Sequence, residues 1–306
     1  MSSDPFTVLS RSLTAFAEAF RDLLTGNPQP APGSPADREA EGEPFAGDWG
    51  EYPSRDIFAT TYLAVTSCTD HLLAVASVLD ARSAVFASYT LMRAAAEAAA
   101  IGCYLTDRDI DGHERLRRNM NYRLEGLCEQ IRMVRGFSGD DAAQKVARNE
   151  KRISDFARSA GLHGFVFHKM SGRGHPAYLD EPQPSAMKLM GLAADKDSPG
   201  LGATYQRHLS SVAHSGLHGL ARLLAPVAPN VGRPGEALAA VNLDPHSLAV
   251  ELVIGPLCAV SLAKGVQWFT GCNMGDLTGP ANSMLLTWAR VGELKTPGAP
   301  PPRRVR

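Results

Sequence analysis

Apolar residues recur along most of this chain at intervals of three and four, the spacing of one face of an α-helix. Between residues 4 and 25 six apolar side chains follow it: Phe6, Leu9, Leu13, Phe16, Phe20 and Leu23. Similar periodicity predicts further helices over 55–79, 83–106, 112–135, 140–160, 184–195, 201–225, 246–270 and 280–292. Alternating β-branched runs are missing, so no strand is predicted. The pattern predicts an all-α multi-helix bundle with long antiparallel core helices.

Two segments interrupt this pattern. Residues 27–54 are rich in proline, glycine and acidic residues, which predicts a flexible loop or linker. The chain ends in "KTPGAPPPRRVR", a proline-rich and basic stretch that predicts a disordered tail. We therefore expect an N-terminal helical arm (1–26), a flexible linker (27–54), a single helical domain (55–292) and a disordered tail (293–306).

Composition limits the kinds of binding site and the cellular locations that we expect for this chain. Hydrophobic residues make up 44% of the chain and the formal net charge is −1, so any nucleic-acid site must be a local patch. The five cysteines form no CxxC pair, which favours buried reduced thiols. No signal peptide precedes the first helix, and the apolar run 247–269 is interrupted by Glu251, Pro256 and Lys264. We expect a cytoplasmic protein without a membrane span.

The segment "YQRHLSSVAHSGLHGLARLL", residues 205–224, holds three of the chain's nine histidines. On a helical projection its polar residues form one stripe opposite the leucines: Arg207, Ser211, His214, His218 and Arg222. The stripe lacks the lysines and acids of an ordinary solvated face. This composition favours a stripe that faces a ligand or another helix, and a plain solvated face remains the alternative.

Two chemistries fit the stripe. His214 and His218, at i and i+4, could chelate a metal with a third ligand from Glu97, His163, His168 or His175, but no HExxH motif is present. Alternatively, His214 acts as acid and base on a phosphodiester while Arg207 stabilises the phosphoryl oxygens. In RNA the 2′-hydroxyl is the nucleophile, so this second chemistry needs no cofactor and no metal.

"RHLSSVAH", Arg207 to His214, resembles the Arg-x(4–6)-His motif of HEPN-domain proteins, and "YQRHLSSVAHSG" is similar to a segment of all-helical bacterial proteins of the DUF5677 type. The resemblance covers this helix and, more loosely, the helices before it. It implies a homodimer of helical bundles. It also implies either a metal-independent ribonuclease of a toxin–antitoxin or defence system, or an inactive relative that only binds.

Other helices carry further candidate binding residues. Arg93 and Glu97, at i and i+4 in "LMRAAAEAAAIGCYL", form either a surface ion pair or the wall of a cavity that faces the 205–224 helix, and we favour the cavity. Arg118, Asn121 and Glu125 share a face of the arginine-rich helix 112–135. That face is either solvated or a phosphate-binding strip.

The sequence supports two functions, and a metal-dependent enzyme, with His214 and His218 as ligands, is a third hypothesis. The first is a HEPN-like protein that cleaves RNA, with His214 as acid and base, Arg207 as the phosphate stabiliser and Ser211 and His218 as binding residues. The alternative is a non-catalytic helical module. Its polar pocket, formed by Arg93, Glu97, Arg207 and His214, would hold a small polar or anionic ligand.

Overall fold

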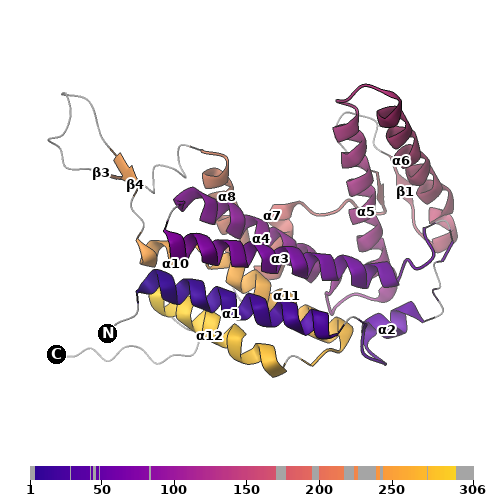
Figure 1. The fold of residues 1–306 in the computed structure, drawn as a ribbon. Coiled ribbons are helices and arrows are strands. Elements are labelled where there is room, and N and C mark those ends of the chain that lie inside the picture. Colours follow the sequence, from indigo (N-terminus) through magenta and orange to yellow (C-terminus); the bar gives the residue numbers. More distant parts are fainter. Residues whose placement is uncertain are drawn as a thin grey trace, which may run out of the picture.

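The fold is an all-α multi-helix bundle, as the apolar periodicity predicts (Figure 1). A computed structural model of the chain describes residues 4–27, 29–41, 43, 46–47, 49–82, 84–169, 177–194, 200–216, 224–226, 239–241, 244–273 and 275–293. The predicted tail therefore lies outside the described residues, apart from residue 293.

Two long antiparallel helices form the centre of the bundle, α3 (Arg55–Ala81) and α4 (Val85–Leu105). Helix α11 (Ile254–Thr270) packs against α4, where Gly102 leaves room for Leu262. A β-carbon at Gly102 would lie 2.4 Å from Leu262 Cδ1, so glycine permits this close approach. The large core between these helices is built almost entirely of aliphatic and aromatic side chains.

The N-terminal helix α1 (Pro5–Gly26), expected as an arm, lies in this core between α3 and α12 (Gly275–Val291). Its apolar stripe is buried except for Leu23, which is partly buried, and Trp288 Nε1 donates a hydrogen bond to Ser12 Oγ at 3.2 Å. Figure 1 shows α1 and α12 side by side below α3. The sequence did not predict this packing, because the proline and glycine content of residues 27–54 does not show where the helix before them docks.

Part of segment 27–54, predicted as a flexible loop, is folded. Helix α2 (Pro35–Ala40) begins after Ser34, whose hydroxyl accepts a hydrogen bond from the Asp37 amide. Trp49 is only 1% exposed and stacks on Phe165 at 5.5 Å between ring centroids. A Ser-Pro helix start and a single tryptophan anchor this segment despite its many prolines.

Helices α5 (Gly112–Val134) and α6 (Asp140–Ser159) form an antiparallel pair that stands away from one end of the bundle (Figure 1). A second apolar core joins them to α2, with Leu116, Met120, Leu124 and Phe156 at its centre. Beyond them lie the 3₁₀ turn η1 (Ala160–His163) and the two-stranded antiparallel sheet of β1 (Phe167–His168) and β2 (Tyr178–Leu179).

The remaining elements are α7 (Ala186–Ala194), α8 (Leu201–Ala213), β3 (Leu224–Pro226) paired with β4 (Ala239–Val241), and α10 (Pro245–Leu252). The two small sheets were not predicted, because strands of two or three residues leave no alternating pattern. The predicted helix 246–270 is two helices, α10 and α11, bent by 40°. Pro256 lacks the N–H that would continue α10 into α11.

Helix α8 ends at Ala213 and does not continue to 225 as predicted. The Ser215 amide donates to Val212 O at 3.0 Å and the Gly216 amide to Ser211 O at 2.7 Å, the hydrogen-bond pattern of a Schellman cap. Ser215 takes the left-handed φ of 55° that this cap requires. The polar stripe that contains Arg207 therefore lies on a helix only as far as His214, the residue that caps α8.

Among the described helices, α3 is long and apolar enough to cross a membrane. Helices α10 and α11 reach that length and composition only when the bent pair is taken as one span. The core helix of a soluble protein can have the same length and composition. Because α3 lies between α1 and α4, its apolar character is weak evidence for a span.

Candidate functional site

Three of the predicted site residues meet between α4 and α8. Arg93 Nε donates to Glu97 Oε1 at 2.7 Å, and Arg93 Nη1 lies 3.0 Å from His214 Nε2. The same Nη1 donates to Ser210 Oγ at 3.3 Å. The side chains of Arg93 and Glu97 are 21% and 29% exposed, so the pair lies at the edge of the core and reaches solvent. We call Arg93, Glu97, Ser210 and His214 the α4–α8 site.

The contact with Arg93 involves the Nε2 atom of His214. A guanidinium only donates hydrogen bonds, so this contact is a hydrogen bond in the tautomer whose Nε2 accepts. His214 is exposed and follows the last residue of α8, where the Schellman cap turns the chain away. The site therefore presents a solvent-accessible basic nitrogen beside a fixed positive charge.

Arg207 and Ser211 occupy the same helix as His214 but are not part of its contacts with Arg93. Arg207 is exposed, and no described residue forms a hydrogen bond or ion pair with it. Two helical turns separate Arg207 from His214, so one substrate could engage both. Ser210, which the helical projection did not single out, contacts Arg93 in place of Ser211. His218 lies outside the described residues.

The sequence reasoning missed a buried polar cluster on the neighbouring face of α8. His208 Nε2 lies 3.3 Å from Glu251 Oε2, and both side chains are 12% exposed. Tyr89 OH donates to the same oxygen, and the Tyr89 ring meets the His208 ring edge-on at 5.9 Å. An acid inside the apolar run 247–269 was the available signal, because a buried carboxylate needs a partner. This cluster ties α4, α8 and α10 together.

Tyr205 adds a second link between α8 and α10. Its hydroxyl donates to Val250 O at 2.7 Å. Burial, followed by the charge of Glu251, raises the pKa of the Tyr205 hydroxyl above its usual range. The phenol therefore stays protonated at neutral pH and keeps its hydrogen bond. Together with His208 it fixes the helix that carries Arg207 and His214.

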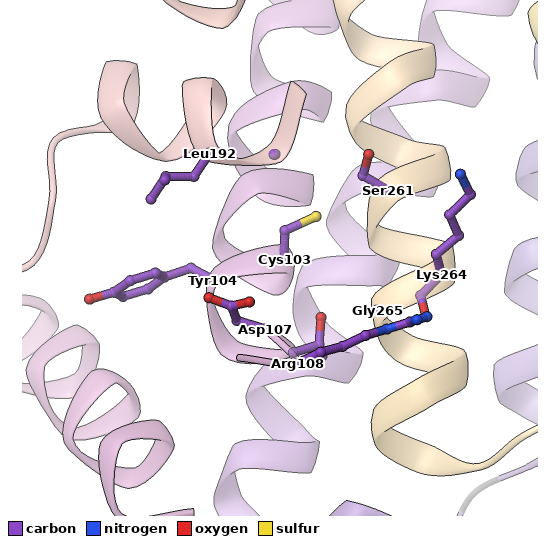
Figure 2. Close-up of a pocket in the computed structure, with 10 residues that line it drawn as sticks. Cys103, Tyr104, Asp107, Arg108, Leu192, Ser261, Lys264 and Gly265 are labelled. Atoms are coloured by element: carbon purple, nitrogen blue, oxygen red, sulfur yellow. The ribbon is translucent and has the colours of Figure 1, made fainter. Parts of the chain in front are cut away.

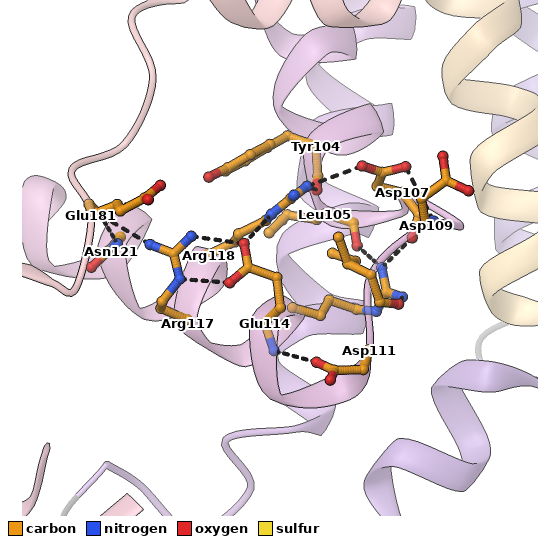
Figure 3. Close-up of polar contacts among 12 residues, drawn as sticks. Tyr104, Leu105, Asp107, Asp109, Asp111, Glu114, Arg117, Arg118, Asn121 and Glu181 are labelled. Atoms are coloured by element: carbon orange, nitrogen blue, oxygen red, sulfur yellow. Dashed lines mark hydrogen bonds and ion pairs between the residues drawn. The ribbon is translucent and has the colours of Figure 1, made fainter. Parts of the chain in front are cut away.

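The candidates Arg118 and Asn121 make structural contacts on α5 (Figure 3). Arg118 donates to Glu114 Oε1 at 2.8 Å and to Tyr104 O at 2.8 Å, and Asn121 pairs with the backbone of Leu179 in β2. Burial alone would raise the pKa of Glu114, but hydrogen bonds from Arg117 and Arg118 hold it below its usual range. The donors of this strip are thus already engaged, which disfavours phosphate binding.

Glu125 lies in a different place, a groove of about 940 Å³ lined by residues of α3, α4, α5 and α6. Glu97 lines the same groove from the side of α4. Burial, and then the charge of Glu129, raises the pKa of the Glu125 carboxyl. The structure therefore brings Glu97 and Glu125 to one groove, while Arg118 and Asn121 are not among its lining residues.

A second cavity, of about 270 Å³, lies where α4 meets α7 and α11 (Figure 2). Cys103, Asp107 and Ser261 line it, with Arg108 and Lys264 at one side. Burial raises the pKa of the neighbouring Tyr104 hydroxyl, which keeps it protonated. None of the predicted site residues that the structure describes lines this cavity, and its polar groups could hold only a small ligand.

Metal ligands do not gather in the part of the chain that the structure describes, where no group of three histidine, cysteine, aspartate or glutamate side chains could hold an ion. His175 and His218, two of the ligands considered for a metal, lie outside these residues. All five cysteines are free thiols.

Comparison with known proteins returned no match: no family model, no curated protein and no solved structure is significantly similar to the chain. The residues of the α4–α8 site and the motif resemblance of Arg207 to His214 are therefore the features that bear on function.

Proposed function

We propose that the α4–α8 site cleaves phosphodiester bonds of RNA without a metal, as the HEPN-like resemblance implies, and that the protein acts in the cytoplasm as a homodimer. The observation that carries the proposal is the 3.0 Å contact between Arg93 Nη1 and His214 Nε2. It joins an unprotonated imidazole nitrogen to a phosphate-binding group at an exposed helix end.

The chemistry follows from these groups. A substrate phosphate offers Arg93 a charged acceptor, and movement of the guanidinium toward it frees Nε2 of His214. Nε2 then takes the proton of the 2′-hydroxyl, and the 2′-oxygen bonds to phosphorus. Arg93 and Arg207 stabilise the charge on the non-bridging oxygens. The bond to the 5′-oxygen breaks, His214 returns the proton to it, and a 2′,3′-cyclic phosphate and a 5′-hydroxyl remain.

Replacement of His214 tests this function. We expect His214→Ala to lower the cleavage rate on a panel of single-stranded and hairpin RNAs by at least about 100-fold, the usual contribution of general acid–base catalysis. The matched control is His246→Ala, since His246 is also exposed but lies on α10. Equal melting temperatures would show that both variants fold. Wild-type protein that leaves every RNA intact would refute the proposal.

A non-catalytic binding module is the second candidate. It is favoured by the same contact, because Arg93 already occupies the lone pair of His214 and Arg207 is exposed. The site would then hold a small anion between two guanidinium groups. Under this function inorganic phosphate or a nucleotide raises the melting temperature, Arg93→Met and Arg207→Met abolish the rise, and no RNA is cut.

A further inference from the structure

The cavity between α4, α7 and α11 is a binding site that the proposed function does not use. Its volume of about 270 Å³ is close to the lower end of the range for small-molecule pockets, about 300–1,000 Å³. Arg93, Glu97, Ser210 and His214 are not among its lining residues. A molecule of the size of a small metabolite fits this volume, whereas a nucleic acid strand or a peptide helix does not.

Two cationic residues line the cavity on the side of α11. Arg108 reaches from the end of α4 to α11, where its Nη2 donates a hydrogen bond to Lys264 O at 3.2 Å (Figure 2). Lys264 itself is the second cation, and both residues are exposed. Neither forms an ion pair with a residue that the structure describes. Both charges are therefore available to an anionic ligand.

The carboxylate of the cavity is already neutralised. Asp107 is the one acidic residue of the lining, and it pairs with Arg118 at 3.3 Å. Arg118 and Arg117 both pair with Glu114, so this group combines two carboxylates with two guanidinium groups (Figure 3). Asp109 is exposed and does not line the cavity. An excess of positive charge remains on the side of α11, and it attracts an anion.

The opposite side of the cavity is apolar. Leu192 and Ala193 of α7 line it there, across from Arg108 and Lys264 (Figure 2). Leu192 is 49% exposed, so a ligand that contacts it would remove apolar surface from water. A cationic side and an apolar side favour a ligand that is anionic at one end and apolar at the other.

We propose that this cavity binds a short-chain carboxylic acid, with its carboxylate at Arg108 and Lys264 and its hydrocarbon chain at Leu192 and Ala193. The guanidinium fork matches the two oxygens of a carboxylate, and hydrogen bonds between charged groups are stronger than those between neutral ones. A cationic ligand would be repelled by the same two residues. Inorganic phosphate would leave the apolar side without a contact. This proposal does not depend on the chemistry of the α4–α8 site.

The probe is hexanoate, which is ionised at neutral pH. Hexanamide has nearly the same shape without the charge, and acetate has the charge without the chain. Saturation-transfer NMR titrations with the full chain measure the Kd of each compound. Each cavity variant has a control at an exposed residue of the same type that does not line the cavity. The pairs are Arg108→Gln with Arg290→Gln, Lys264→Gln with Lys188→Gln, and Leu192→Gln with Leu286→Gln.

We expect hexanoate to bind with a Kd of about 1 mM or lower, and hexanamide and acetate to bind at least about tenfold more weakly. Each cavity variant should weaken hexanoate binding about tenfold, while the three controls bind as wild type. Equal melting temperatures without ligand would show that all variants fold. Equal binding of hexanoate and hexanamide would overturn the proposal, as would cavity variants that bind like their controls. Absence of hexanoate binding at about 10 mM, ten times the expected Kd, would also overturn it.

Discussion

Arg115 shows at the scale of one residue how this fold handles a buried charge. Its side chain is fully buried, and its guanidinium donates to the carbonyl oxygens of Leu105, Asp107 and Ile110 and pairs with Glu39 at 3.0 Å. The three carbonyls belong to the end of α4 and the turn after it. Arg115 therefore satisfies carbonyl groups that are buried or partly buried, and its role is structural.

We expect Arg115→Met to lower the free energy of unfolding by about 3–5 kcal/mol, because it leaves the Glu39 carboxylate and the carbonyl oxygens without a partner. Urea denaturation measures this change. Arg135→Ala is the control: Arg135 pairs with Glu150 with both side chains more than half exposed, and its removal should change stability by less than about 1 kcal/mol. A loss in Arg115→Met no larger than that of the control would show that the buried network does not stabilise the fold.

Residue patterns predicted part of the candidate site. Arg93 and Glu97 are charged residues in an otherwise apolar helix pattern, and His214 lies on the polar stripe. The structure brings the three together. His208 is not among the residues of the predicted stripe, yet its Nε2 lies 3.3 Å from Oε2 of Glu251, a residue from a distant part of the chain. A projection of one helix cannot show such a partner, since only tertiary packing brings the two together.

At the scale of elements, the periodicity located most helices but not their ends. Helix α8 was extended beyond His214 because apolar spacing continues through "GLHGLARLL". The Schellman cap at Ser215 and Gly216 ends it instead. Local hydrogen bonds of one serine and one glycine thus override a pattern that extends over many residues, and they place His214 at an exposed helix end.

Gly216→Ala tests this cap. The added β-carbon would lie 2.7 Å from Ser211 Oγ and 3.0 Å from Ser211 O, so the turn must shift. We expect stability to fall by about 1–2 kcal/mol. The control is Gly279→Ala in α12, where the β-carbon meets open space and a helix interior gains about 0.5–1 kcal/mol from alanine. Thermal unfolding compares the two. Stabilisation by both substitutions would show that α8 does not need this cap.

At the scale of the whole molecule, the N-terminal helix decides whether the chain is one folding unit. The sequence suggested an arm joined by a linker, because proline and glycine separate residues 1–26 from the rest. The structure buries Leu9, Leu13, Phe16 and Phe20 of α1 fully against α3 and α12. Loss of α1 would uncover the apolar faces of two helices at once, a larger change than any single substitution.

A chain that begins at residue 27 should therefore lose cooperative unfolding or aggregate, because the surfaces of α3 and α12 that contact α1 would meet water. Circular dichroism melting and light scattering measure both effects. The milder variant Phe16→Ala should unfold as one unit but with a free energy lower by about 3–5 kcal/mol, the usual cost of removing a buried phenylalanine. If the shortened chain instead melted at the wild-type temperature, α1 would be a separable arm. In that case the helices that pack against α8, namely α4, α7 and α10, would support the α4–α8 site without α1.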